Sequence, residues 1–174
     1  MATFITNIKF TQQGIKHIAH STKRAAIFKA EAKKLAKVAG EAAAETGALF
    51  ILTHNYTGYP MIRQAGAMVA EGALGKIRVV QVEYAQDWLS TAVEETGSKQ
   101  AGWRTDPAKS GAGGATGDIG THAFNLAGFV TGLALESLAA DLQALVRGRR
   151  VDDNGNVLRR YKGGARGMLW CSQV

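Results

Sequence analysis

The chain has 174 residues, 46% of them hydrophobic and 20% charged, with a formal net charge of +7 at pH 7. This composition is that of a globular protein of one domain, or one domain with a fragment of another, and no apolar run reaches the roughly 18 residues that a transmembrane helix requires. The single cysteine, Cys171, excludes an internal disulfide framework and favours a reducing cytoplasm.

The N-terminal third contains few recognisable features. Residues 1–22 contain no acidic side chain and are expected to form an irregular or foreign N-terminus. Residues 23–46 are rich in Ala, Lys and Glu, which predicts a helix that stops at Gly47. The apolar run over 48–54 then predicts a strand that is buried on both faces.

A helix and a strand are predicted next. A turn over 55–59 places Pro60 at the first position of a helix that Gly72 and Gly75 close. Residues 76–89 alternate between two faces, which predicts a strand.

The second half of the chain is expected to begin with a loop and to end with a hairpin. Periodicity is absent over 90–117, and a loop of that length is more often functional or mobile than idle. A helix follows over 118–132, whereas residues 135–146 are compatible with a helix or a strand. Two alternating runs then flank Gly163-Gly164, a two-residue signal for a β-hairpin.

A group of basic residues surrounds the predicted hairpin. It consists of Arg147, Arg149, Arg150, Arg159, Arg160, Lys162 and Arg166. Either a nucleic-acid-binding patch or a solvated strand face would account for such a group. The solvated face is the preferred interpretation, so nucleic acid is not an expected partner.

The stretch GATGDIGTHAFNL, at residues 114–126, places Asp118 four residues before His122, on one face of the predicted helix. A carboxylate and an imidazole can form a proton-transfer pair, because histidine titrates near neutral pH. Equally, Asp118 can cap the helix and His122 can be a core residue bonded to a backbone carbonyl. As metal ligands they would need partners such as His54 and Cys171, which lack the spacing of a zinc motif, so no metal is expected.

Polar segments accompany this pair and together indicate a binding site. His54, Asn55 and Tyr56 directly follow the predicted buried strand, where open α/β sheets bind ligands. Trp103 and Arg104 offer an apolar wall and a fixed cation, both usual in sites for polar ligands. The glycine-rich GAGGATG lets backbone approach a ligand, but it is neither a dinucleotide fingerprint nor a Walker loop.

Four stretches resemble the Gfo/Idh/MocA family of NAD(P)-dependent oxidoreductases, named after glucose–fructose oxidoreductase and inositol dehydrogenase. They are THNYTGYPMIRQA, EGALGKIRVVQVEYAQDWL, WRTDPAKSGAGGATGDIGTHAFNLAGFVTG and GGARGMLWCSQV, all within residues 30–174. The resemblance implies an α/β (α+β) fold with the remnant of a Rossmann domain over 23–60. Part of an open, mostly antiparallel substrate and oligomerisation sheet would follow over 61–174.

The same resemblance implies a reaction and roles for single residues. The reaction is hydride transfer between NAD or NADP and a carbon of a sugar or cyclitol. His122 resembles the catalytic acid/base, and Asp118 resembles its partner facing the substrate. The remaining candidates are Tyr56, Trp103 and Arg104 for substrate, and His54 and Asn55 for the cofactor.

The chain also departs from the family pattern. It has no G-x-G-x-x-G loop, and near residues 25–27, where the family carries Glu-Lys-Pro, it has Ala-Ala-Ile. We therefore expect the middle of a longer enzyme, incomplete as it stands. The outward-facing Met168, Trp170 and Val174 predict a homo-oligomer through the open sheet. The alternative is a non-catalytic interaction module that binds nucleic acid through its basic hairpin.

Overall fold

The computed structural model describes residue 41, residues 44–47 and residues 54–174. The predicted N-terminal segment, most of the first helix and nearly all of the buried strand lie outside the described residues. Residues 44–46 are helical and Gly47 has a φ of 68°, in agreement with the predicted stop. In the part of the chain that the structure describes, no helix is both long and apolar enough to cross a membrane.

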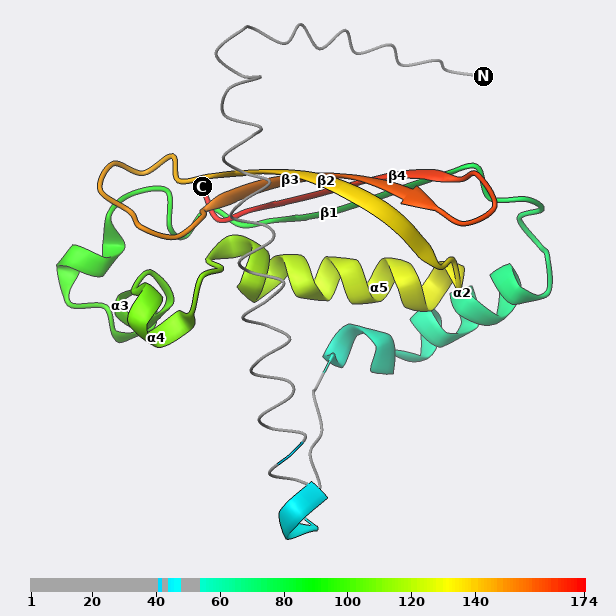
Figure 1. The fold of residues 1–174 in the computed structure, drawn as a ribbon, viewed down its shortest axis with the longest axis horizontal. Helices are drawn as coiled ribbons and strands as arrows, with labels where there is room; N and C mark the ends of the chain where they lie inside the picture. The colour runs from blue at the N-terminus through cyan, green and yellow to red at the C-terminus, as the bar shows by residue number, and fades with distance from the viewer. Residues whose placement is uncertain (1–40, 42–43, 48–53) are drawn as a thin grey trace, which may run out of the picture.

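A four-stranded sheet lies over a long helix (Figure 1). In spatial order its strands are β1 (Val79–Ala85), β4 (Arg166–Ser172), β3 (Asn154–Tyr161) and β2 (Leu135–Gln143). β1 runs parallel to β4, and the other two pairings are antiparallel. The sheet is therefore mostly antiparallel, as predicted, and the helix beneath it is α5 (Thr121–Thr131).

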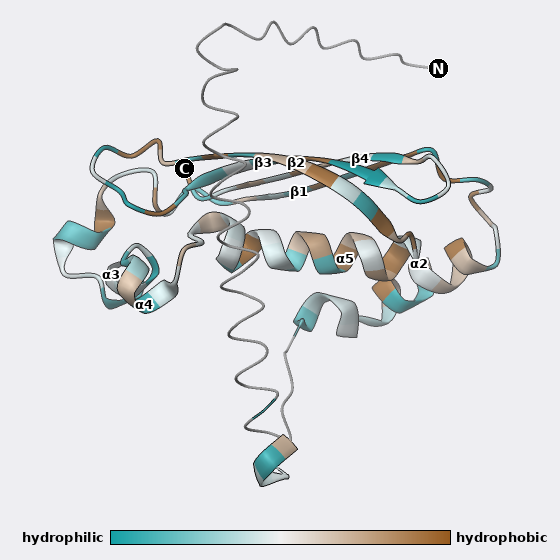
Figure 2. Ribbon diagram, in the orientation of Figure 1, coloured by the Kyte–Doolittle hydropathy of each residue, from teal (hydrophilic) through white to brown (hydrophobic). Residues whose placement is uncertain are grey.

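Alternation along the strands decides which side chains meet α5. Val80 packs with Ala127 of the helix, and Leu169 packs with Ala123. Small residues on α5 let the helix approach the sheet closely, and Figure 2 shows apolar residues recurring along it beneath the strands. The opposite face of the sheet, which carries Met168, is exposed. The predicted alternation is thus confirmed, with one covered face and one open face.

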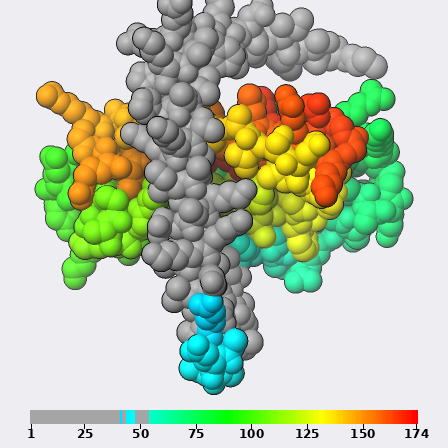
Figure 3. All heavy atoms as spheres, viewed as in Figure 1, coloured from blue at the N-terminus to red at the C-terminus, as the bar shows by residue number. Residues whose placement is uncertain are grey.

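The turns fall where the sequence places them. Gly163 and Gly164 have φ values of 85° and 95° and join β3 to β4, which confirms the hairpin. Figure 3 shows β2, in yellow, at the surface beside the orange-red hairpin. Pro60 begins α2 (Pro60–Ala70), which packs on α5 where Gly66 meets Phe129.

The predicted long loop over 90–117 is wrong. This region contains η2 (Val93–Thr96), α3 (Lys99–Arg104) and α4 (Pro107–Ser110). Each is too short to show a periodic apolar face, so only their first residues could reveal them. Ser98 and Asp106 cap α3 and α4 by accepting hydrogen bonds from backbone N–H groups. The ambiguous segment over 135–146 forms strand β2.

Two members of the basic group are buried, contrary to the predicted solvated face. Arg149 lies in an internal network of ion pairs. Arg159 is 2% exposed and lies over the rings of Phe124 and Tyr161. Burial lowers the pKa of Arg159 below its ordinary value. The basic group is therefore not one continuous surface patch.

Candidate active site

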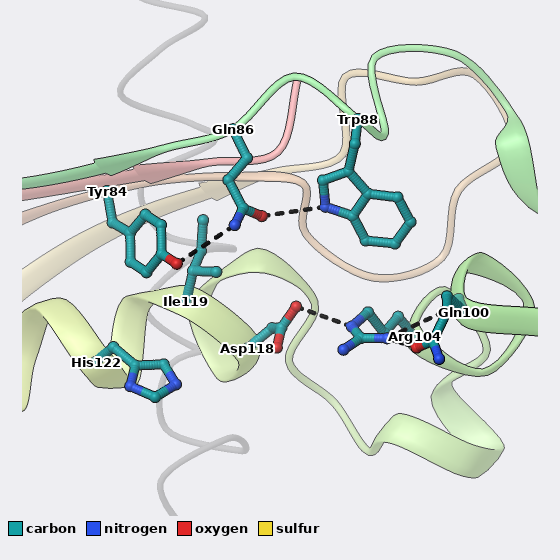
Figure 4. Close-up of a pocket in the computed structure, with 8 residues that line it drawn as sticks. All are labelled: Tyr84, Gln86, Trp88, Gln100, Arg104, Asp118, Ile119 and His122. Carbon is teal, nitrogen blue, oxygen red and sulfur yellow. Dashed lines mark hydrogen bonds and ion pairs between the residues drawn. The ribbon is translucent and has the colours of Figure 1, made fainter. Parts of the chain in front are cut away.

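A cavity of about 410 Å³ opens between the end of β1 and the start of α5 (Figure 4). Three predicted site residues, Arg104, Asp118 and His122, meet in its wall. The complete lining consists of Tyr84, Gln86, Trp88, Gln100, Arg104, Asp118, Ile119 and His122. The sequence analysis thus identified these three lining residues and missed the others.

Asp118 lies in a wide helical turn, η3 (Thr116–Gly120), that precedes α5. Such π-helical turns are rare and occur frequently at functional sites. The alternative role of Asp118 as a helix cap is not realised, because the carboxylate of Asp152 occupies that position. Its two oxygens accept the backbone N–H groups of Gly114 at 2.9 Å and Thr116 at 2.7 Å. Asp118 is thereby left free to point into the cavity.

The Asp118 carboxylate is bound at the cavity wall by two donors. Its Oδ2 accepts one hydrogen bond from Nε of Arg104 at 3.0 Å and another from Nε2 of Gln173 at 2.9 Å. Figure 4 shows Asp118 directed toward Arg104. Within the described residues no hydrogen bond joins Asp118 to His122, although both line the same cavity.

The guanidinium group of Arg104 contacts two aromatic rings and one side-chain amide. Its Cζ lies 4.3 Å from the ring centroid of Trp103 and 5.8 Å from that of Trp88. Its Nη1 donates a short hydrogen bond to Oε1 of Gln100. Trp103, predicted to contact substrate, supports Arg104 from outside the lining, and Trp88 is the tryptophan that lines the cavity.

His122 lies among aromatic rings from separate segments. Its ring centroid is 5.3 Å from that of Tyr56, 5.5 Å from that of His54 and 6.5 Å from that of Tyr84. The Nδ1 atoms of His122 and His54 are buried without a partner among the described residues. The alternative interpretation, a histidine anchored to a backbone carbonyl, is therefore not realised at Nδ1.

Two tyrosine hydroxyls meet beside this ring. The hydroxyls of Tyr56 and Tyr84 lie 2.6 Å apart. The hydrogen bond with Tyr84, together with burial, raises the pKa of Tyr56 above its ordinary value, so Tyr56 keeps its proton at neutral pH. Asn55, which begins η1 (Asn55–Gly58), is exposed at the edge of the same segment.

Alternation carries a signal for some of the residues that sequence reasoning missed. Tyr84 lies on the helix-facing side of β1, and Gln86 continues that side beyond the strand's last residue. Nε1 of Trp88 donates to Gln86 at 3.1 Å, and Nε2 of Gln86 donates to the hydroxyl of Tyr84 at 3.4 Å. Gln173 likewise continues the buried face of β4. A polar residue at the end of a buried face is the signal that could have found both glutamines.

Cys171 was a possible metal ligand in the sequence, and its surroundings do not suit that role. Cys171 is a core thiol that contacts Thr116, and burial raises its pKa to about 11. A thiol that keeps its proton at neutral pH is a poor metal ligand. In the described ranges no group of three His, Cys, Asp or Glu side chains is arranged to hold a metal ion.

Known proteins are similar to this chain in sequence. A family model described as the GFO/IDH/MocA C-terminal domain matches residues 62–174. The uncharacterized oxidoreductase YfiI of Bacillus subtilis is 32% identical over 134 residues, which cover 76% of this chain and 34% of YfiI. The chain spans about a third of the length of the curated relatives it matches.

Solved structures of oxidoreductases are also similar to this chain. An oxidoreductase from Sinorhizobium meliloti is 52% identical with a TM-score of 0.63, and the match covers 83% of this chain and 35% of that one. An inositol dehydrogenase homolog from Azotobacter vinelandii, complexed with NADH and myo-inositol, is 33% identical with a TM-score of 0.68. That match covers 80% of this chain and 35% of the homolog.

Proposed function

Because the chain belongs to the Gfo/Idh/MocA family of oxidoreductases, we propose that it is part of an NAD(P)-dependent dehydrogenase that acts on a sugar or cyclitol. The observation that carries the proposal is the meeting of His122, Asp118 and Arg104 in one cavity of about 410 Å³. Carboxylate, guanidinium and amide groups beside an aromatic ring suit a ligand with many hydroxyls. The Azotobacter homolog's complex with NADH and myo-inositol supports both the cofactor and the substrate class.

In this function His122 accepts the hydroxyl proton of the substrate while the carbon gives up its hydride. Asp118 holds a substrate hydroxyl, and Arg104 compensates the charge of that carboxylate. Tyr56 stays a substrate-side candidate because its ring lies against His122. When bound, the nicotinamide supplies the hydride acceptor. The Nδ1 of His54, buried and without a partner among the described residues, fits a polar group placed beside His122. His54 and the neighbouring Asn55 are therefore the cofactor-side candidates.

The domain assignment follows the same proposal. Residues 61–174 form the substrate and oligomerisation domain, and the family match over 62–174 supports that boundary. Residues 23–60 would be the end of the nucleotide-binding domain, and residues 1–22 would belong to neither.

The test is an enzyme assay on a protein that carries these residues together with a nucleotide-binding segment. Reduction of NAD⁺ or NADP⁺ is followed during incubation with a panel of sugars, cyclitols and simple alcohols. We expect turnover with members of the first two groups. Turnover of simple alcohols alone, or of none of the panel, would contradict the proposal.

We expect the 174-residue chain by itself to bind NADH only weakly. The sequence has no G-x-G-x-x-G loop, and the backbone of that loop normally holds the pyrophosphate at a helix N-terminus. A fluorescence titration of NADH against the chain measures this, with the protein carrying a nucleotide-binding segment as the control. Micromolar binding by the chain alone would show that the expectation is wrong.

We also propose that the chain self-associates through the open face of the sheet. Leu158, Met168 and Trp170 are exposed there, and apolar sheet faces of this kind normally pack against a partner. Leu158→Glu should shift the sedimentation coefficient to that of a monomer. Met61→Glu, at a 75% exposed position on α2, is the matched control and should not. A wild-type chain that sediments as a monomer and binds no hydrophobic dye would overturn this proposal.

A further inference from the structure

The bonds to the Asp118 carboxylate are unevenly distributed. Both donors, Nε of Arg104 and Nε2 of Gln173, reach the same oxygen, Oδ2. The other oxygen, Oδ1, receives no hydrogen bond from the described residues, and the side chain is 31% exposed at the cavity wall. One oxygen is therefore anchored in the protein and one is available to a ligand.

Gln173 is itself fixed by backbone bonds on both sides. It directly follows β4 and is 2% exposed. Its N–H donates to the carbonyl of Asp153 at 2.8 Å, and its carbonyl accepts the N–H of Leu89 at 3.0 Å. With both backbone groups bonded, the start of the side chain cannot move freely, and the amide reaches Asp118 from a rigid base.

Arg104 alone would not fix the orientation of the Asp118 carboxylate. Arg104 contacts Asp118 through Nε alone, because its Nη1 is directed to Gln100. A single hydrogen bond leaves a carboxylate free to turn about the bond that joins it to Cβ. A second donor on the same oxygen, from a different direction, removes that freedom.

We propose that Gln173 is a positioning residue that fixes the rotation of the Asp118 carboxylate so that Oδ1 faces the substrate hydroxyl. This inference rests on the function proposed for the cavity. It adds a residue from the end of β4 to a site otherwise built from the end of β1 and the residues after it, α3, η3 and α5.

The test is a double-mutant cycle on kcat/KM. Gln173→Leu removes the donor at similar volume and should lower kcat/KM by about 10- to 100-fold, the usual worth of a hydrogen bond to a charged group. In an Asp118→Ala background the same change should cost less than about 2-fold, because Gln173 acts only through that carboxylate. An equal loss in both backgrounds would mean that Gln173 serves the fold alone, and would overturn the proposal.

Gln143→Leu is the matched control. Gln143 donates to Oδ2 of Asp141 at 2.8 Å and accepts from Nδ2 of Asn154 at 3.1 Å. The variant therefore removes an amide–carboxylate bond of the same kind and one further bond on β2, away from the cavity. Its kcat/KM should stay within about 2-fold of the wild type. Gln173→Glu keeps the shape of the glutamine but places a carboxylate against Asp118, so it should be at least as impaired as Gln173→Leu. Wild-type activity in Gln173→Glu would overturn the proposal even if Gln173→Leu did not fold.

A structural readout separates this proposal from the proposed function. In a crystal structure of Gln173→Leu or Gln173→Glu the Asp118 carboxylate should be rotated or split between orientations. An unchanged carboxylate would reject the positioning role, whatever the enzyme turns over. A wild-type protein with no dehydrogenase activity would reject the function and leave this crystallographic test in force.

Discussion

We expect His122→Asn to lower kcat by about 10²- to 10⁴-fold in an enzyme that carries these residues, the usual contribution of a positioned acid or base. The oxidised hydroxyl must release a proton within hydrogen-bond reach, and His122 is the imidazole in the cavity wall. Asparagine retains a polar side chain of similar reach but cannot accept the proton. Affinity for NADH should hardly change, because in the proposed function the imidazole would contact the oxygen on the reacting carbon and not the pyrophosphate.

The ring cluster requires a control for packing. The centroid of His122 lies 5.3 Å from that of Tyr56, so removing the imidazole also removes aromatic contacts. His122→Phe keeps an aromatic ring at this position but cannot accept the proton, so it should lose kcat as His122→Asn does. Steady-state kinetics, NADH titration and thermal unfolding on the same preparations separate the two roles. Near-normal kcat in a folded His122→Asn protein would end the acid/base assignment.

The parts of the fold predicted from sequence are those encoded by neighbouring residues. Alternation over 76–89 identified β1, and Gly163-Gly164 identified the hairpin, because each is specified within a few positions. The helices over 93–110 left no periodic trace because none completes a repeated apolar face. Residues 135–146 stayed ambiguous because strand β2 draws its stability from pairing with β3, which composition does not reveal.

The sequence predicted several residues of the candidate site but not the hydrogen bonds and ion pairs that position them. Asp118 directly follows the glycine-rich segment in the sequence, yet Asp152, 38 residues beyond Gly114, provides the cap. Gln173 lies 55 residues from Asp118, so their bond follows from the sheet topology and not from local sequence. Arg149 looked like any member of a basic group, because one of its two acidic partners, Glu94, is also 55 residues away.

That buried arginine carries the largest expected effect on stability. The side chain of Arg149 is 1% exposed and forms ion pairs with Glu94 at 2.9 Å and Asp153 at 3.1 Å. It also donates to the carbonyls of Leu89 and Thr91. We expect Arg149→Met to reduce the free energy of unfolding by about 3–5 kcal/mol, because the buried Asp153 would lose its countercharge. Chemical denaturation followed by circular dichroism measures the loss.

The neighbouring arginine supplies a matched control. Arg150 also forms an ion pair, with Asp106 at 3.0 Å, but its side chain is 68% exposed. Arg150→Met should therefore cost no more than about 1 kcal/mol. The contrast tests burial, since both variants remove one arginine and at least one ion pair. Equal losses in the two variants would contradict the structure around Arg149.

The pH dependence of the Arg149→Met loss gives an independent signature. The hydrogen bond from Arg149 holds the pKa of Glu94 below its ordinary value of 4.5. A carboxyl whose pKa is lowered by folding contributes stability that is complete above the unfolded pKa and is lost as pH falls through the folded pKa. The wild type should therefore lose part of its advantage over Arg149→Met below about pH 4.5, and keep all of it at neutral pH.

Because Leu89 bonds both Arg149 and Gln173, the same variant should also disturb the cavity, and activity should fall even where the protein remains folded. If activity falls only in proportion to the folded fraction, Arg149 stabilises the fold without affecting the cavity.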